Sequence, residues 1–326
     1  MIRALVIATA VTAGAATAAA QPAQLVNAIA GDKAGVDHMT LVGESAQLYA
    51  PVEGGWQREH AGGIAGDVEA VAKAKDGTIF VAGGRAPLYE LDGGAWNIAS
   101  LGVRQRSRAH SLTGIPVVSS GRNVYMLDGD RWRRVASTPG RVELIWASAK
   151  NKIYVADDSG EIARGDGRRW TTISNAFTPP ETPVRFVGVP GKALYAVGDA
   201  GTIVDVGGAA ARKVKLPAEL TGLQVTAGGA AKGVVYFAGT VGEDQVLAKV
   251  NGAALERVDA LPALEAGDRY SLVAGDKTGA LLVASYAGTV RVRAADGTWS
   301  DRTLSIDLPD EAPVAARDGR KPARTQ

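Results

Sequence analysis

Short apolar segments separated by glycine-containing turns run through most of the chain. In one unit, VEAVAKA is followed by a turn at Asp76 and Gly77, then by TIFVAGG, PLYEL, a turn at Asp92 to Gly94, and AWNIASL. Asp-Gly between short alternating segments is typical of β-hairpins, because glycine tolerates the positive φ angles that tight turns require. The pattern therefore predicts four short strands in each unit.

The unit recurs along the sequence, and tryptophans mark equivalent places in five copies. These are Trp56, Trp96, Trp132, Trp170 and Trp299. Two degenerate copies, whose equivalent positions are Ala211 and Leu255, fill the long gap, so that successive copies lie 36 to 44 residues apart. Four strands in such a repeat form the blade of a propeller. The sequence therefore predicts an all-β protein, a seven-bladed β-propeller of four-stranded antiparallel blades.

Other aromatic residues recur in register with the tryptophans. Phe80, Tyr154 and Tyr195 share one position of the second strand, and Tyr49, Tyr89 and Tyr125 share one position of the third. Aromatic residues that repeat in register most simply fill the layers between blades. We expect them, and the five tryptophans, to belong to the core.

The repeats do not predict how the first and last blades close the ring. The first unit begins with its own inner strand and the last ends with TWSDRTLSI, so no blade is obviously shared between the two ends. Closure by packing of the edges is one interpretation. The other is an additional strand from residues before Leu25 or after Asp307.

The two ends of the chain differ in composition from the repeats. Residues 1–20 combine Arg3, an apolar run and small residues, which predicts a signal peptide cleaved after Ala20. The alternative, a membrane anchor, needs a longer apolar run. The propeller is expected over residues 21–306, and residues 307–326 are expected to be a flexible charged tail. These features predict a periplasmic or secreted protein with no membrane span in the mature chain.

Charge and cysteine content narrow the class of protein. The chain has 36 basic and 34 acidic residues, and without Arg3 the mature net charge is +1. This balance argues against nucleic acid as a partner, because nucleic-acid-binding proteins usually carry a strongly basic face. The chain contains no cysteine, so disulfides and thiolate metal sites are excluded.

One stretch resembles a known group of proteins. ALYAVGDAGTIV (residues 193–204), preceded by DGRRW (residues 166–170), resembles the repeats of bacterial BNR-like and YVTN/WD40-like propellers. The resemblance implies the propeller fold over the mature chain. In the sialidase Asp-box the aspartate stands five residues before the tryptophan, whereas Asp92 stands four and Asp296 three residues before theirs. Glycosidase chemistry is therefore not carried over by the resemblance.

A search for reactive constellations identifies no catalytic residues, no metal site and no cofactor. His38, His60 and His110 fall at three different repeat positions, so they do not predict a zinc site. The run Asp157 to Glu161 has the oxygens of a calcium loop but not the spacing of an EF-hand, and a turn explains it better. AGDKTG and VGVPGK lack the spacing of a phosphate loop and are interpreted as hairpin turns. The sequence therefore favours a protein without enzymatic activity over an enzyme, but it does not decide between them.

Charged loops suggest a candidate binding face. The connections between blades and the turns from second to third strands share one face of a propeller. The basic candidates there are Arg85, Arg104, Arg106, Arg108, His110 and Arg122. The acidic candidates are Asp157, Asp158, Glu161, Asp199, Glu243 and Asp244. Such a face would orient charged partners, and ordinary solvated loop charges are the alternative.

Three functions remain open at this point. The first is a non-catalytic binding or scaffold propeller whose partner is another envelope or extracellular protein. The second is a lectin that binds a glycan in aromatic pockets between blades. The third is a hydrolase of glycans or esters that uses carboxylates in the channel. The absence of reactive motifs favours the first.

Overall fold

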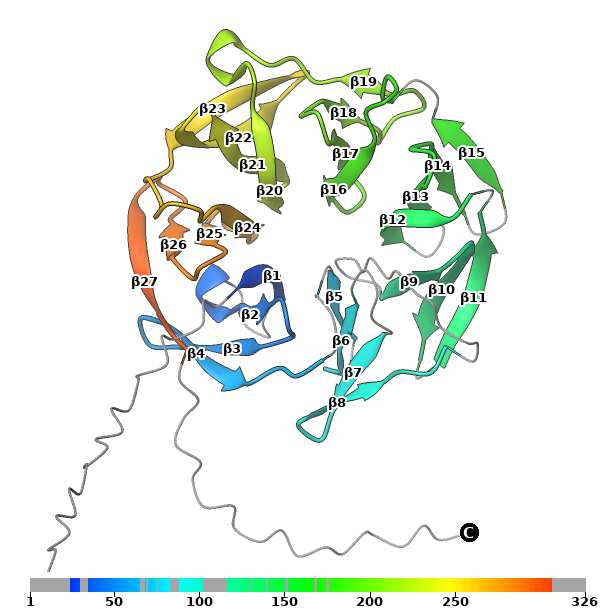
Figure 1. The fold of residues 1–326 in the computed structure, drawn as a ribbon, viewed down its shortest axis with the longest axis horizontal. Helices are drawn as coiled ribbons and strands as arrows, with labels where there is room; N and C mark the ends of the chain where they lie inside the picture. The colour runs from blue at the N-terminus through cyan, green and yellow to red at the C-terminus, as the bar shows by residue number, and fades with distance from the viewer. Residues whose placement is uncertain are drawn as a thin grey trace, which may run out of the picture.

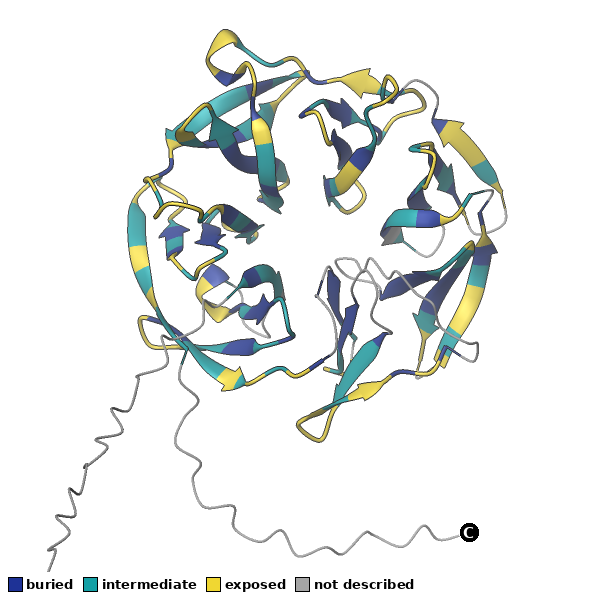
Figure 2. Ribbon diagram, in the orientation of Figure 1, coloured by how far each residue is buried: buried dark blue, intermediate teal, exposed yellow. Residues whose placement is uncertain are grey.

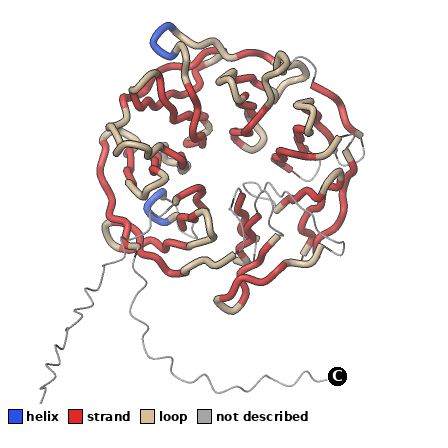
Figure 3. Tube along the Cα trace, viewed as in Figure 1, coloured by secondary structure: helices blue, strands red, loops and turns tan. Residues whose placement is uncertain are grey.

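The computed structural model describes the repeat region with interruptions. It covers residues 24–29, 35–64, 68, 70–74, 76–82, 88–101, 116–129, 131–138, 140–149, 152–166, 169–173 and 176–306. The predicted signal peptide and tail lie outside the described residues. Strands make up nearly all of the regular secondary structure of the described residues, and the only helices there are the short η1 (Val36–His38) and η2 (Ala218–Leu220), as Figure 3 shows.

The strands are arranged as blades around a ring (Figure 1). The first blade contains β1 (Leu25–Ile29), β2 (Thr40–Gly43), β3 (Leu48–Val52) and β4 (Gly55–His60). The second contains β5 (Ala70–Lys73), β6 (Ile79–Ala82), β7 (Tyr89–Asp92) and β8 (Ala95–Ile98). The third contains β9 (Val117–Ser120), β10 (Asn123–Asp128) and β11 (Arg131–Ser137). The fourth contains β12 (Val142–Ala149), β13 (Lys152–Asp157), β14 (Ile162–Gly165) and β15 (Trp170–Ile173).

The remaining blades follow in chain order. The fifth contains β16 (Pro183–Val189), β17 (Ala193–Gly198), β18 (Ile203–Asp205) and β19 (Arg212–Lys213). The sixth contains β20 (Gln224–Ala231), β21 (Val234–Val241), β22 (Asp244–Asn251) and β23 (Ala254–Ala260). The seventh contains β24 (Tyr270–Gly275), β25 (Leu281–Ser285), β26 (Val290–Arg293) and β27 (Trp299–Ser305). The third blade has three described strands, and residues 102–115, which precede β9, lie outside the described residues.

Antiparallel pairing within each blade gives the ring two distinct faces. We call the loop face the one that carries the connections between blades and the turns from second to third strands, such as residues 158–161. We call the turn face the one that carries the turns from first to second strands, such as residues 190–192, and from third to fourth strands. The two faces follow from the reversal of direction at every strand.

Apolar side chains are buried between neighbouring blades, and Figure 2 shows many buried positions on the inner and second strands. Three edge-to-face ring pairs among the described residues join adjacent blades, and one of them is between His60 of β4 and Trp96 of β8. Phe80 of β6 lies 5.3 Å from Trp132 of β11, and Tyr195 of β17 lies 6.3 Å from Phe237 of β21, measured between ring centroids. This geometry is favourable for aromatic rings beyond the area they bury. The prediction that the repeating aromatic residues pack between blades is confirmed at these positions.

The five repeat tryptophans lie on the fourth strand of their blade, as the repeat predicts, and of these five only Trp56 is fully buried. The other four are half-buried, because the outermost strand of a blade has one side toward solvent. Trp56 is 1% exposed, and its Nε1 donates a hydrogen bond of 2.6 Å to the carbonyl oxygen of Met39. All four half-buried tryptophans still pack against clusters of buried apolar residues, so the expectation that the five belong to the core is confirmed.

The ring closes through a parallel pairing of two outer strands. The last residues of β27 lie beside the start of β4, with Thr303 opposite Gly55, Leu304 opposite Trp56 and Ser305 opposite Gln57. The first and seventh blades therefore form one sheet of eight strands. Each of the two blades keeps four strands of its own, so no blade is shared between the ends of the chain.

Polar contacts reinforce this closure from the inner to the outer edge. At the inner edge the backbone nitrogen of Leu25 donates to the carbonyl oxygen of Tyr286 at 3.1 Å. Farther out, Arg302 Nε donates to Asp37 Oδ1 at 2.9 Å, across the same junction.

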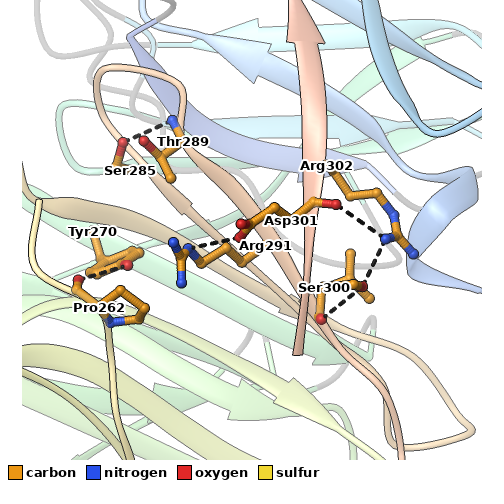
Figure 4. A network of polar contacts seen from close by, with 9 residues as sticks. Pro262, Tyr270, Ser285, Thr289, Arg291, Ser300, Asp301 and Arg302 are labelled. Atoms are coloured by element: carbon orange, nitrogen blue, oxygen red, sulfur yellow. Dashed lines mark hydrogen bonds and ion pairs between the residues drawn. The ribbon is translucent and has the colours of Figure 1, made fainter. Parts of the chain in front are cut away.

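Within the seventh blade a polar network holds β27 in position (Figure 4). Arg291 pairs with Asp301 at 3.2 Å, and Arg302 Nη1 donates to Ser300 Oγ at 2.7 Å. The strand that closes the ring is therefore anchored on β26 before it reaches β4.

The closure predicts a sensitive position at Gly55. A Cβ atom there would lie 1.9 Å from the carbonyl oxygen of Thr303, so Gly55→Ala must push the two outer strands apart. We expect a loss of about 1–3 kcal/mol in the free energy of unfolding, the usual cost of overpacking. Urea denaturation measures it, with Gly208→Ala as the matched control because the nearest atom to a Cβ there is 3.7 Å away. Equal midpoints for the two variants would contradict the role of this pairing.

The contact between Tyr286 and Glu44 predicts a loss of stability at alkaline pH. The Tyr286 hydroxyl donates to Glu44 Oε2 across the junction of the seventh and first blades. Burial, followed by this hydrogen bond and the carboxylate charge, raises the pKa of Tyr286 to about 12. Between the unfolded pKa of about 10 and the folded value, the folded state keeps a proton that the unfolded state has lost, so stability falls as pH rises.

The measurement is the difference in free energy of unfolding between the wild type and Tyr286→Phe as a function of pH. We expect the stabilising difference to be constant below pH of about 9 and to shrink above it, by at most about 1.4 kcal/mol per pH unit for one proton. Using the difference removes the contributions of the other tyrosines. A difference that does not change with pH would contradict the assignment.

Candidate binding face and central channel

The structure places the described candidate residues on the loop face, as the repeat frame predicts. Arg122 lies in the turn between β9 and β10, and Asp157 and Asp158 lie where β13 turns toward β14. Asp199 follows β17 in the equivalent turn of the fifth blade. The other basic candidates are outside the described residues and stay predictions. These are Arg85, Arg104, Arg106, Arg108 and His110.

Two of the acidic candidates hold loops in place. Asp157 Oδ1 accepts hydrogen bonds from the backbone and hydroxyl of Ser159, at 3.0 and 2.6 Å, and from the backbone of Glu161 at 3.0 Å. Asp199 accepts from the backbone and hydroxyl of Thr182, both at 3.2 Å. Much of the hydrogen-bonding capacity of these carboxylates is therefore used inside the loop face.

A second group of carboxylates on this face is directed toward solvent. Asp158, Glu243 and Asp244 are exposed, and within the described part of the chain their side chains make no hydrogen bond or ion pair. The exposed guanidinium of Arg122 lies on the same face. These groups can meet a charged partner without first breaking a contact.

The motifs considered for metal or phosphate are turns. VGVPGK forms the turn between β16 and β17, and AGDKTG forms the turn between β24 and β25. Asp157 to Glu161 forms the turn between β13 and β14. Among the residues that the structure describes, no group of three His, Cys, Asp or Glu side chains is placed to hold a metal ion.

A channel of about 1490 Å³ runs between the inner strands. In the described part of its wall, β-bulges occur at the same place in five blades, and each leaves one residue of the inner strand unpaired. The bulged residues are Val26, Glu143, Val184, Thr226 and Ser271. All five line the channel. A bulge re-aims side chains, so this repeated irregularity shapes the loop-face end of the channel.

Two arginines at this end of the channel were not found by sequence reasoning. Arg185 of β16 and Arg269, which precedes β24, both line the channel. Arg185 Nη2 donates to the carbonyl oxygen of Thr226 at 3.1 Å, and the Arg269 guanidinium lies 5.1 Å from the ring centre of Tyr286. Within the described residues neither guanidinium forms an ion pair.

The channel wall affects the electrostatics of Arg185. The side chain is exposed to water, yet the surrounding wall desolvates it, which lowers the pKa of the guanidinium. The positive charge of Arg269 lowers the pKa further. Arginine nevertheless stays protonated in proteins. The channel mouth on the loop face therefore holds two arginines that form no ion pair within the described residues, and the carboxylates of Glu44 and Glu143 line the same channel.

The sequence contains a weak signal for Arg185 alone. In the segment PVRFVGV it is the charged residue of an otherwise apolar strand, which by itself is consistent with a solvent-facing position. Its proximity to Arg269 depends on how the fifth and seventh blades face each other across the ring. No local pattern encodes that proximity.

Comparison with known proteins identifies similarity at the level of structure. No protein-family model matches the chain, and no curated protein matches it significantly in sequence. The structure of YCF48 from Cyanidioschyzon merolae is similar with a TM-score of 0.61 and 12% identity, covering 83% of this chain and 95% of that chain. The WD40 propeller domain of Doa1 is similar with a TM-score of 0.56 and 16% identity, covering 86% and 93% of the two chains.

A third propeller extends the similarity. Cps50 (Swd1) from Myceliophteria thermophila has a TM-score of 0.58 and 10% identity, covering 83% of this chain and 97% of that chain. No helix among the described residues is long and apolar enough to cross a membrane. Identities this low show the fold and not the function. The predicted fold class is confirmed: this chain is an all-β propeller, with the fold that WD40 and YCF48 propellers share.

Proposed function

We propose that this protein is a non-catalytic, exported propeller that binds another envelope or extracellular protein on its loop face. The observation that carries the proposal is the set of charged groups on that face that have no ion-pair partner among the described residues. They comprise the carboxylates of Asp158, Glu243 and Asp244 and the guanidiniums of Arg122, Arg185 and Arg269. Charged groups that are free before binding steer a partner and set its orientation.

The rigidity of the face supports the same function. Asp157 and Asp199 hold their turns through hydrogen bonds, and Glu181 Oε1 accepts a hydrogen bond of 3.0 Å from the backbone of Thr202. Loops held in this way lose little conformational entropy when a partner binds. A preorganised charged surface on a rigid scaffold suits recognition.

The alternative of a lectin has less support from the geometry. Aromatic pockets between blades would need rings that a sugar can reach. Phe80 and Tyr195, at the repeated aromatic position, are buried and engaged with rings of the next blade. No described observation favours a glycan over a protein.

Export is the part of the proposal that depends on the sequence alone. Mass spectrometry of the protein from its own cell envelope gives the mature N-terminus, and we expect it at Gln21. The same material, mildly cross-linked and purified by affinity, identifies the partner for the measurements below.

The charge pattern predicts which variants lose the partner. We expect Asp158→Lys with Asp244→Lys to weaken the purified complex by about tenfold or more, the scale of a few interfacial charge contacts. The complex of the wild type should also weaken as salt increases. The matched control is Glu53→Lys with Asp92→Lys, two exposed acidic positions on the turn face. Isothermal titration measures both.

A second variant tests the basic candidates. Arg104→Glu with Arg106→Glu and Arg108→Glu should abolish a salt-sensitive complex if these residues belong to the face. Unchanged affinity in both the acidic and the basic variants would refute binding on the loop face. An equal loss of affinity in the turn-face control, Glu53→Lys with Asp92→Lys, would also refute binding on the loop face.

A further inference from the structure

Lysines from consecutive blades gather at the opposite end of the channel. Lys192, Lys232 and Lys277 lie in the turns between first and second strands of the fifth, sixth and seventh blades. All three are exposed, and all three line the channel. We call these three residues the lysine rim.

The turns that carry the rim are in contact with one another. Lys192 extends toward the sixth blade, where its Nζ lies 2.9 Å from the place that a Cβ on Gly233 would occupy. Lys232 extends toward the seventh blade, where its Cδ lies 3.5 Å from the corresponding place on Gly279. The backbone nitrogen of Lys232 also donates to the carbonyl oxygen of Asp276 at 2.8 Å. The rim is thus one continuous arc across three blades.

The nearby carboxylate of Asp276 leaves the rim with an excess of positive charge, since it is one anion against three ammonium groups. Asp276 Oδ1 accepts hydrogen bonds from its own turn, from Thr278 N at 2.8 Å, Thr278 Oγ1 at 2.7 Å, Gly279 N at 3.0 Å and Ala280 N at 3.1 Å. Partial burial opposes ionisation of Asp276, but these hydrogen bonds outweigh it and lower its pKa. Within the described residues none of the three rim lysines forms an ion pair.

The backbone of Lys232 gives an independent reason to assign its side chain a role. Lys232 has a φ of +48° and Gly233 a φ of +81°, so the pair forms a two-residue hairpin turn with positive φ at both positions. Such turns favour Asn, Asp or Gly at the first position. A lysine there adopts a conformation that costs about 1 kcal/mol or more. A lysine that occupies this position despite the cost points to a use for its charge.

We propose that the lysine rim binds an acidic segment of a partner polypeptide at the turn-face mouth of the channel. The cations are spread over three blades, which matches carboxylates distributed along an extended chain better than a single small anion. The ammonium group is a point charge without a fixed fork geometry, so it suits carboxylates presented in varied orientations. The site lies on the face opposite to the proposed protein-binding face and does not depend on that proposal.

Fluorescence anisotropy of the full chain with a labelled Glu-Gly repeat peptide tests the rim. We expect the Glu peptide to bind, and the matching Gln-Gly peptide to bind about tenfold or more weakly. Replacing all three rim lysines, as Lys192→Gln, Lys232→Gln and Lys277→Gln, should weaken the Glu peptide by a similar factor. The control removes three exposed cations near the outer strand of the fifth blade, as Arg212→Gln, Lys213→Gln and Lys215→Gln, and should leave binding unchanged.

A single variant separates binding from folding. Lys232→Gly removes the ammonium group and relieves the positive φ, so we expect weaker peptide binding with a melting temperature equal to or above that of the wild type. Equal binding of the Glu peptide by the wild type and the triple rim variant would overturn the proposal. Displacement of the peptide by inorganic phosphate at equal concentration would also overturn it, since it would assign the rim to small phosphate ions.

Discussion

The parallel pairing of β27 with β4 is the constraint on which the rest of this propeller depends. Blades contact their neighbours through side chains, so a row of blades has two apolar ends until the first and last meet. Here only three residue pairs join the outer strands, and the absence of a side chain on Gly55 allows their close approach. The contacts of Leu25 with Tyr286 and of Asp37 with Arg302 hold the same junction farther in. The contacts that close the ring therefore extend from the inner edge to the outer edge of the two blades.

A closed ring fixes what each face can present. Because strands alternate in direction, every turn from second to third strand appears on the loop face and every turn from first to second strand on the turn face. The repeated bulge then directs one residue of five inner strands toward the channel. The chemistry of the channel is therefore set by single positions in otherwise similar blades. This is how a repeated scaffold acquires a specific site.

The sequence repeat made the blades predictable. The features that depend on contacts across the ring could not be predicted from it. Spacing of the tryptophans and the shared register of Phe80 and Tyr195 reflect local strand order, which recurs in every unit. Closure depends on the register between two strands at opposite ends of the chain, and the proximity of Arg185 to Arg269 depends on blades that are not neighbours. Neither leaves a periodic signal. The predicted basic loops at Arg85 and Arg104 to Arg108 lie outside the described residues and stay predictions.

The net charge of this chain conceals a separation of charge along the axis of the channel. A count of formal charges treats Asp157, Asp199 and Asp276 as equal to any other carboxylate, yet each is hydrogen-bonded to a nearby loop. Carboxylates used in this way stabilise turns and contribute less to recognition of a partner. Among the described residues, the charged groups that form no ion pair differ at the two ends: carboxylates and guanidiniums on the loop face, and the three ammonium groups of the lysine rim. Partners of different charge therefore suit the two mouths, and one channel can distinguish them by the end that they approach.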